Sequence, residues 1–464
     1  MDLWDFEKYR ERIAVITEQD KEYRYGEIYE FQKEIARHIE KRSLVCMAVG
    51  NDMGSLMGYL ACVVNDSVPL LVSAQIRKAD MLNMVETYMP EYIWIPTKSD
   101  YLAAGQGYIK IFSYWDYELW ERMEKCGQQL NSELALLLPT SGSTGNPKLV
   151  RLSRGNIQSN TKSICEYLKL SETERAVTSL PMSYTYGLSI IHTFLHVGAS
   201  IYITGQSVCR KSFWTGVKKH QVTFFAGVPY TYESMKRMGI REQTLQSLTK
   251  LTQAGGRLSN GLQMYWGEFA CKTNKEFYVM YGQTEATARI SYLPPEYCLD
   301  KIGSVGIPVP GCQIQIAGEG NTIEEPQKIG EIVCNGQNVS MGYGRERSDL
   351  ATGDENNGIL YTGDLGYRDD EGFIYIRGRK SRFGKVYGKR VDLAYLEIQL
   401  ECDLQIYAVL LSDDKRIFIY TDSGKQQSAV EYIQLKTGFP IHVLECKGLT
   451  ELPRNEYGKV KYGM

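Results

Sequence analysis

A loop rich in hydroxyl groups and glycine follows the apolar segment 136–138 and ends in a lysine. Small residues let backbone N–H groups converge on an anion, and the lysine adds a positive charge, so we expect this loop to bind phosphate groups. It is not the P-loop of NTPases, because Lys148 is preceded by Pro147 and followed by Leu149, where that motif has Gly and then Ser or Thr. The residues expected to bind phosphate are Thr140, Ser141, Gly142, Ser143, Thr144, Gly145 and Lys148.

A second cluster, Tyr281-Gly282-Gln283-Thr284-Glu285, follows the apolar segment 277–280. A tyrosine at the end of a strand can pack on a planar base, and Thr284 can donate a hydrogen bond to a phosphate. Glu285 supplies the hard oxygen ligand that Mg²⁺ prefers. Taken alone, this cluster is a weak signal.

A third cluster places Asp364 in the turn-like sequence Tyr361-Thr362-Gly363-Asp364, with Arg379 fifteen residues later. One carboxylate can accept hydrogen bonds from both hydroxyls of a ribose. An Asp-Gly turn is common, so this cluster by itself fits an ordinary turn at least as well. A fourth signal is Lys459, in the tail segment 453–461, where a lysine is normally an exposed terminal residue.

The segments between these clusters alternate between helical patterns and short β-branched or apolar runs, which predicts an α/β fold with mainly parallel sheets. From about Gly303 the expected strands become short and closely spaced, which predicts an antiparallel, β-barrel-like module. Helices are expected at 25–42 and 155–168, and strands at 44–49, 92–95, 176–180, 200–203, 224–226, 313–316, 330–334 and 373–376.

A small α+β unit is expected at the end of the chain, with a helix at 393–401 and strands at 405–411 and 416–420. Basic residues crowd the stretch 377–390 that precedes it, and such stretches usually connect domains. We therefore place a domain boundary at about Ser381, which divides the chain into residues 1–380 and 381–464.

Composition excludes several classes of protein. The 464 residues predict two to four domains, and 53 Lys and Arg against 55 Asp and Glu give a net charge of −2. This balance disfavours a nucleic-acid or membrane-surface binder. The 11 cysteines form no CxxC pair, which indicates reduced thiols. We expect a cytoplasmic protein, since the chain has neither a signal-like N-terminus nor an apolar run long enough to span a membrane.

The four clusters together resemble the adenylate-forming enzyme superfamily, which includes acyl-CoA synthetases, the adenylation domains of nonribosomal peptide synthetases and firefly luciferase. The resemblance implies a large N-terminal domain of two parallel-rich α/β subdomains plus the β-barrel-like module. It also implies a small mobile C-terminal domain that rotates between two catalytic poses. The matching segments, in order, are 23–28, 140–148, 281–285, 330–343, 361–364, 378–379 and 453–459.

The resemblance implies attack of a carboxylate on the α-phosphorus of ATP, which gives an acyl adenylate and pyrophosphate. The acyl group then passes to a thiol, either coenzyme A or the phosphopantetheine of a carrier protein. By this resemblance, the loop 141–148 binds the β- and γ-phosphates, Thr284 contacts the α-phosphate and Glu285 binds Mg²⁺. Asp364 and Arg379 bind the ribose, and Gly255 and Gly256 form the wall beside the adenine and the acyl group. Lys459 is the catalytic residue for adenylation.

This chain departs from the family at the hinge, because Ser381 stands where members usually have an acidic residue. It is also shorter than common members.

The segment 180–189 predicts the kind of acid. Members that activate α-amino acids place an aspartate just after an aromatic residue, because a buried ammonium needs a carboxylate partner. Here Thr185 follows Tyr184, so we expect an aliphatic or aryl acid without an α-amino group. An amino-acid-activating enzyme and a non-catalytic nucleotide-binding regulator are the alternatives. The expected lining residues are Tyr184, Tyr186, Gly227, Val228, Gly255 and Tyr281.

Overall fold

The computed structural model describes residues 3–101, 107–124, 126–139, 148–240, 244–318, 320–422 and 424–449. For Ser381, Phe383, Arg390, Cys402 and Asp422 the backbone is described without the side chain. Among these residues the strands form two large sheets and two small ones.

The first large sheet has thirteen strands in the order β17-β18-β20-β21-β16-β15-β14-β13-β12-β10-β11-β1-β2. In chain order these are β1 (Ile13–Thr17), β2 (Glu22–Arg24), β10 (Arg175–Val177), β11 (Ser200–Ile203), β12 (Phe224–Gly227), β13 (Lys250–Gln253), β14 (Glu276–Tyr281), β15 (Ser291–Leu293), β16 (Ser304–Pro308), β17 (Cys312–Ala317), β18 (Gly330–Gly336), β20 (Ile359–Arg368) and β21 (Ile374–Arg379).

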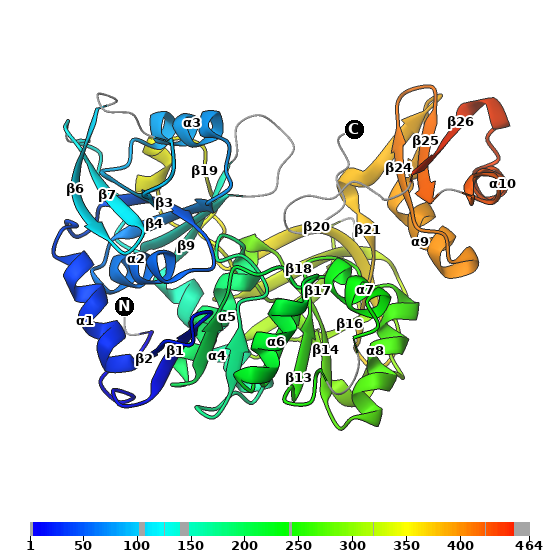
Figure 1. Cartoon of the computed structure of the whole chain (residues 1–464). Helices are drawn as coiled ribbons and strands as arrows, with labels where there is room; N and C mark the ends of the chain where they lie inside the picture. Colours follow the sequence, from blue (N-terminus) through cyan, green and yellow to red (C-terminus); the bar gives the residue numbers. More distant parts are fainter. Residues whose placement is uncertain are drawn as a thin grey trace.

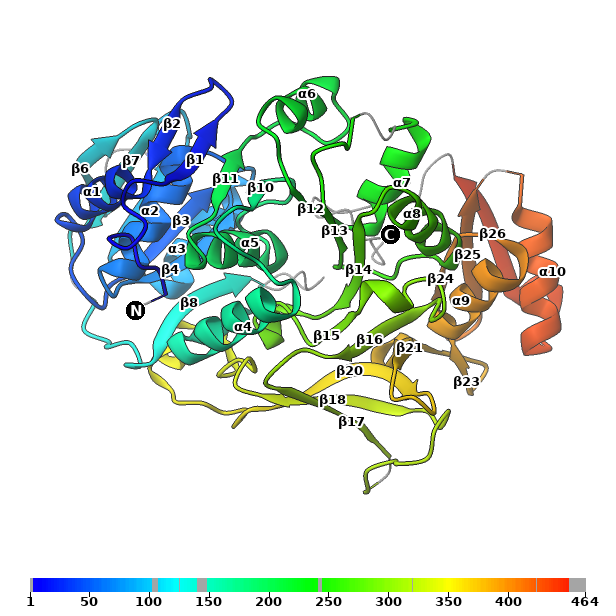
Figure 2. The same ribbon diagram turned by 90° about the horizontal axis from the view of Figure 1, so that it is seen from below.

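The pairing within this sheet changes from parallel to antiparallel at β15. Neighbouring strands from β1 through β11, β10, β12 and β13 to β14 run parallel, whereas every pair from β14–β15 to β17–β18 is antiparallel. The predicted parallel fold and the predicted antiparallel module are both confirmed. The structure adds that the two join edge to edge, so the carboxyl end of β14 lies where one pattern meets the other (Figure 2).

The second large sheet has the order β19-β9-β8-β4-β3-β5-β7-β6. Its central strands are continuous apolar runs, as expected for parallel strands covered on both faces, and all six residues of β3 are buried. The strands are β3 (Leu44–Val49), β4 (Val68–Ser73), β5 (Tyr92–Pro96), β6 (Tyr108–Tyr114), β7 (Tyr117–Arg122), β8 (Leu134–Pro139), β9 (Leu149–Ser153) and β19 (Tyr343–Gly344).

Helices cover the sheets (Figure 1), and a side chain caps the start of α2, α4, α8 and α9. The α4 helix, for example, begins with a capping box in which Ser153 and Asn156 satisfy each other's backbone N–H groups. The helices are α1 (Tyr25–Ala36), α2 (Met53–Val64), α3 (Lys78–Tyr88), α4 (Arg154–Tyr167), α5 (Thr185–His196), α6 (Lys211–Lys219), α7 (Pro229–Arg237), α8 (Asn260–Lys272), α9 (Leu393–Leu404) and α10 (Gln426–Thr437).

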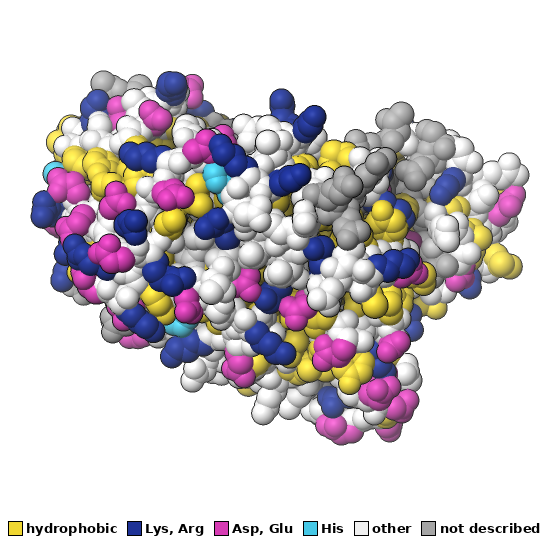
Figure 3. All heavy atoms as spheres, turned by 60° about the horizontal axis from the view of Figure 1, so that its bottom comes forward, with side chains coloured by type: hydrophobic (Ala, Val, Ile, Leu, Met, Phe, Trp, Pro, Cys, Tyr) yellow, Lys and Arg dark blue, Asp and Glu magenta, His cyan; other side chains and the backbone are white. Residues whose placement is uncertain are grey.

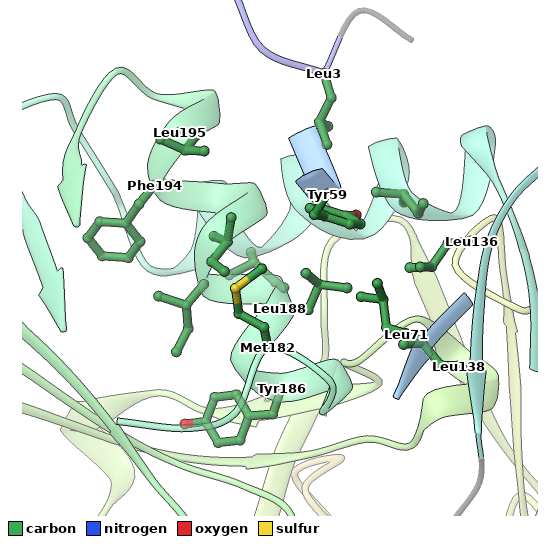
Figure 4. Packing of buried hydrophobic residues seen from close by; sticks show 14 of the residues in the cluster. Leu3, Tyr59, Leu71, Leu136, Leu138, Met182, Tyr186, Leu188, Phe194 and Leu195 are labelled. Atoms are coloured by element: carbon green, nitrogen blue, oxygen red, sulfur yellow. The ribbon is translucent and has the colours of Figure 1, made fainter. Parts of the chain in front are cut away.

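The α5 helix matters most for the site, because buried side chains fix it between the two large sheets. Figure 4 shows Leu188 of α5 in the same apolar cluster as Leu71 of β4 and Leu138 of β8. Tyr186 lies at the end of the helix that leads into the site. Burial of several large apolar residues gives this helix a fixed position.

The small unit after β21 has an apolar cluster of its own, which extends from Val386 to Leu444. It lies at one end of the molecule in Figure 1, and its helix α9 contacts β21. Its elements besides α9 and α10 are η4 (Lys380–Arg382), β22 (Phe383–Val386), β23 (Lys389–Asp392), β24 (Ala408–Ser412), β25 (Ile417–Asp422), η5 (Ile441–Val443) and β26 (Leu444–Leu449).

Differences from the predicted elements are confined to their ends. The helix expected to reach residue 42 stops at Ala36, because the chain turns into β3 and Arg42 has a positive φ of 59°. Positive and negative side chains are interspersed on the face shown in Figure 3, in keeping with the net charge of −2. Within the described parts of the chain, no helix is long and apolar enough to cross a membrane.

Candidate active site

Strands β8 and β9 flank the predicted phosphate loop. They pair in antiparallel fashion, with Pro139 opposite Leu149, so the two ends of the loop lie side by side. The loop residues Thr140 to Pro147 lie outside the described residues, as does Lys459. Lys148, the last of the predicted phosphate-binding residues, is described and lies directly before β9.

Tyr343 connects Lys148 with Glu285. Strand β19 pairs with β9, and the Nζ atom of Lys148 lies 3.6 Å from the centroid of the Tyr343 ring. The hydroxyl of the same tyrosine donates a hydrogen bond of 2.8 Å to Oε1 of Glu285. The predicted phosphate-binding lysine and the predicted magnesium ligand therefore meet on one side chain, which the sequence analysis had not assigned a role.

Glu285 suits a magnesium ion that is shared with phosphates. No described residue donates a hydrogen bond to its second oxygen, and no group of three or more His, Cys, Asp or Glu that could hold a metal occurs within the described residues. Mg²⁺ typically takes one or two carboxylates together with substrate phosphates and water, which matches a single carboxylate here.

The loop after β14 is folded tightly back on itself. A Cβ atom at Gly282 would lie 1.9 Å from the carbonyl oxygen of Ala288, so glycine is required for this close approach. Thr287 and Ala288 have φ angles of 57° and 125°, which residues with side chains rarely adopt. At the start of the loop, the Thr185 hydroxyl donates a hydrogen bond of 3.0 Å to Oγ1 of Thr284, which links α5 to the predicted α-phosphate contact.

The predicted ribose-binding pair is formed. Asp364 and Arg379 are register partners on β20 and β21, and Nε of Arg379 donates a hydrogen bond of 2.8 Å to Oδ1 of Asp364. Asp364 is buried, and its charge raises the pKa of Arg379. A surface pocket lined by Thr362, Gly363, Arg379 and Lys380 opens beside the pair.

Tyr281 also belongs to this group. Its hydroxyl donates a hydrogen bond of 2.5 Å to Oδ2 of Asp364. Burial, followed by the neighbouring Asp364 charge, raises the pKa of Tyr281 well above its ordinary value, so the hydroxyl stays protonated and remains a donor. The sequence predicts that the Tyr281 ring packs on a base, and the structure adds the contact of its hydroxyl with Asp364.

Four of the residues predicted to line the acid site come together. A Cβ atom at Gly255 would lie 2.4 Å from the Tyr184 hydroxyl and 3.2 Å from Val228, and the rings of Tyr184 and Tyr186 are 6.4 Å apart. Gly255 also has a φ of 83°, so glycine is required there. By contrast, the two other glycines, Gly227 and Gly256, face α7.

Arg289 is the residue of this region that the sequence analysis missed. It is 3% exposed, and its Cζ atom lies 4.0 Å from the centroid of the Tyr186 ring. Burial raises the pKa of Tyr184 to about 12, and the Arg289 charge opposes this shift. The one available signal was a charged residue among the small and apolar residues after the Thr284-Glu285 pair.

Three of the seven basic residues in the stretch 377–390 form ion pairs with carboxylates among the described residues. Lys380 forms an ion pair of 3.0 Å with Glu331, and Arg382 pairs with Glu397 of α9. The backbone of Ser381 lies between Arg379, which pairs with Asp364, and Arg382, which pairs with Glu397 of the small unit.

A loop that ends in lysine, a carboxylate suited to Mg²⁺, and a buried aspartate paired with an arginine together define an enzyme that activates carboxylic acids with ATP. The chain belongs to the AMP-binding enzyme family, whose family model matches residues 4–344. It is an AMP-forming acid–thiol ligase, which uses ATP and Mg²⁺ to make an acyl adenylate and then transfers the acyl group to a thiol.

Two curated relatives are 2-succinylbenzoate–CoA ligases. That of Bacillus velezensis is 28% identical over 403 residues, which cover 84% of this chain and 80% of the relative. That of Bacillus cereus strain ATCC 14579 is 27% identical over 471 residues, which cover 97% and 94%.

The fold has matches among solved structures. O-succinylbenzoate coenzyme A synthetase (MenE) from Bacillus subtilis in complex with AMP matches with a TM-score of 0.77 and 23% identity, covering 98% of this chain and 95% of that one. ATP-bound MatB from Rhodopseudomonas palustris matches with a TM-score of 0.76 and 19% identity, covering 97% and 94%.

Proposed function

We propose that this enzyme forms the thioester between coenzyme A and a carboxylic acid that lacks an α-amino group. The observation that carries this proposal is the charge at the acid site: the buried guanidinium of Arg289 lies 4.0 Å from the centroid of the Tyr186 ring. A buried guanidinium repels an α-ammonium group, which would instead need a carboxylate. The names of the curated relatives support coenzyme A as the acceptor and make 2-succinylbenzoate the first acid to test.

In the proposed mechanism the described residues bind and orient ATP and the acid. Lys148 and the loop before it hold the β- and γ-phosphates, Thr284 contacts the α-phosphate, and Asp364 with Arg379 holds the ribose. Mg²⁺, when bound at Glu285, neutralises phosphate charge. Since negative charge concentrates on the α-phosphoryl oxygens in the transition state, most of the catalysis is positioning and electrostatic stabilisation.

We further propose that residues 1–380 bind ATP and the acid and that residues 381–464 form the mobile domain that carries Lys459. The separate apolar cluster from Val386 to Leu444 supports this division. The hinge lies at Ser381, where the backbone passes from Arg379 of the nucleotide site to Arg382, which pairs with Glu397.

The test is ATP–pyrophosphate exchange over a panel of fatty, aryl, hydroxy and amino acids that includes 2-succinylbenzoate. We expect exchange with an acid that lacks an α-amino group. Faster exchange with a proteinogenic amino acid than with every fatty and aryl acid would favour the amino-acid-activating alternative. Thioester formation from the adenylate with coenzyme A, compared with a phosphopantetheinylated carrier protein, then identifies the acceptor.

A further inference from the structure

Arg289 carries a buried charge that no carboxylate of the described residues balances. It is 3% exposed, its Nε atom has no hydrogen-bond partner among those residues, and Nη1 donates a long hydrogen bond of 3.4 Å to the Ala288 carbonyl oxygen. Within the parts of the chain that the structure describes, no carboxylate forms an ion pair with it. Buried charges are costly unless they are paired, so this exception calls for an explanation.

The two other buried arginines of the described residues show the usual arrangement. Arg151 pairs with Glu355 at 3.0 Å and donates hydrogen bonds to backbone carbonyl oxygens. Arg347 pairs with Glu91 at 2.7 Å. The fold therefore provides carboxylates for its structural arginines, and Arg289 differs from both.

The backbone on both sides of Arg289 is fixed. Its carbonyl oxygen accepts hydrogen bonds of 3.2 and 2.9 Å from the side-chain amides of Asn160 and Asn338, both of which are buried. The two residues before it have the positive φ angles of 57° and 125°. Strained backbone of this kind persists where the surrounding structure holds it, and it is concentrated at functional sites.

The guanidinium faces the tyrosines that are proposed to line the acid site. The Tyr186 hydroxyl is bonded to Thr252, so the face of its ring remains for contact with Arg289. Burial raises the pKa of Tyr167 to about 12, and both the charge of Arg289 and its hydrogen bonding to the Tyr167 hydroxyl oppose this shift. The Arg289 charge has the same effect on Tyr184 and Tyr186. All three neighbours are neutral at physiological pH. Their rings offset part of the cost of burial by cation–π attraction but supply no negative charge.

We propose that Arg289 binds a second carboxylate of the acid substrate, so that the enzyme activates one carboxyl group of a dicarboxylic acid. A planar guanidinium with several N–H donors matches a carboxylate in geometry as well as in charge. The reacting carboxyl group lies toward Thr284, and the second carboxylate lies at Arg289 beside Tyr184 and Tyr186. This assignment rests on the proposed function, because it takes the acid site of that ligase as given.

The test compares matched acids with and without the second carboxylate. One pair is 2-succinylbenzoate and the analogue that lacks its aromatic carboxylate, and others are linear dicarboxylates with monocarboxylates of equal length. In Arg289→Gln we expect kcat/KM for the preferred dicarboxylate to fall by at least about 30-fold, while the rate with the matched monocarboxylate changes less than about threefold. Arg289→Lys should restore part of the preference. Arg237→Gln, which alters an exposed arginine of α7, is the control.

A wild-type enzyme without preference for any dicarboxylate, or an equal loss for both acids in Arg289→Gln, would overturn the proposal. Calorimetric titration of the acids with AMP present separates this result from failure of the proposed function, because it needs no turnover. If Arg289→Gln binds the dicarboxylate more weakly than the wild-type protein does but binds the matched monocarboxylate equally well, the role of Arg289 is supported even if no acid is activated. Equal binding of the matched acids by the wild-type protein overturns it.

Discussion

The hydroxyl of Tyr343 lies 2.8 Å from Oε1 of Glu285 and donates a hydrogen bond to it. The same ring lies under the ammonium of Lys148, so one side chain contacts both the proposed magnesium ligand and the proposed phosphate-binding lysine. Strand β19, which carries Tyr343, is held by its pairing with β9. Residues from distant parts of the chain are thereby held together at the proposed phosphate site.

Tyr343→Phe removes this hydrogen bond and keeps the ring beside Lys148. We expect the apparent Mg²⁺ affinity to fall roughly tenfold, since groups that orient a metal ligand typically contribute about 10- to 100-fold. The measurement is the Mg²⁺ dependence of ATP–pyrophosphate exchange. Tyr343→Leu, which also removes the ring, should raise the KM for ATP in addition. An unchanged Mg²⁺ dependence in Tyr343→Phe would show that the hydroxyl does not orient Glu285.

Asp364→Asn keeps the shape of the side chain and removes its charge. We expect AMP affinity to fall by about tenfold or more, because hydrogen bonds to charged groups contribute about 1.5–3 kcal/mol. Tyr281→Phe is the matched control, since it removes a donor to the same carboxylate and leaves Oδ2 available to a ribose hydroxyl. Calorimetric titration with AMP measures both. Wild-type affinity in Asp364→Asn would exclude Asp364 from the ribose site.

The parts of this site that sequence predicts best are those that depend on local pattern. Strands β3 and β11 match their expected bounds because continuous apolar runs between turns have few other ways to fold. The two local motifs that contain Asp364 and Arg379 predict that these residues act together, and the hairpin of β20 and β21 places them opposite each other.

Residues whose role depends on distant contacts could not be predicted in the same way. The position of Tyr343 beside Glu285 requires the pairing of β19 with β9, which no local pattern encodes. Arg289 resembles any surface arginine in the sequence, and its significance arises from burial without a carboxylate.

Lys459→Ala should lose at least roughly a hundredfold in adenylate formation, because a buried positive charge directed at developing negative charge is commonly worth about 3 kcal/mol or more. Thioester formation from supplied adenylate should survive, because the implied rotation of the small domain between two catalytic poses takes Lys459 away from the α-phosphate for that half-reaction. Each half-reaction is measured separately, with Lys461→Ala as the control in the same tail. An equal loss in both half-reactions would count against an adenylation role for Lys459.

We expect the stability of the small unit to depend on pH because of the buried Glu397. Its Oε1 atom accepts a hydrogen bond of 2.7 Å from the Leu410 N–H and also contacts Arg382 at the proposed hinge. Burial raises the pKa of Glu397 from 4.5 to about 7, against the opposing effects of Arg382 and Leu410.

Because this pKa is higher in the folded state than in the unfolded state, the stabilisation by Glu397 is fully present below about 4.5 and is lost as pH rises through about 7. The stabilisation lost between these pH values corresponds to about 3 kcal/mol of the free energy of unfolding at most. Hydrogen exchange of peptides from α9 and β24, corrected for intrinsic rates, should therefore show weaker protection at about pH 8 than at about pH 5. Glu397→Gln should remove most of this difference, whereas Glu445→Gln, at an exposed ion pair with Arg416, should keep it. The same pH dependence in Glu397→Gln as in the wild-type protein would assign the titration to another group.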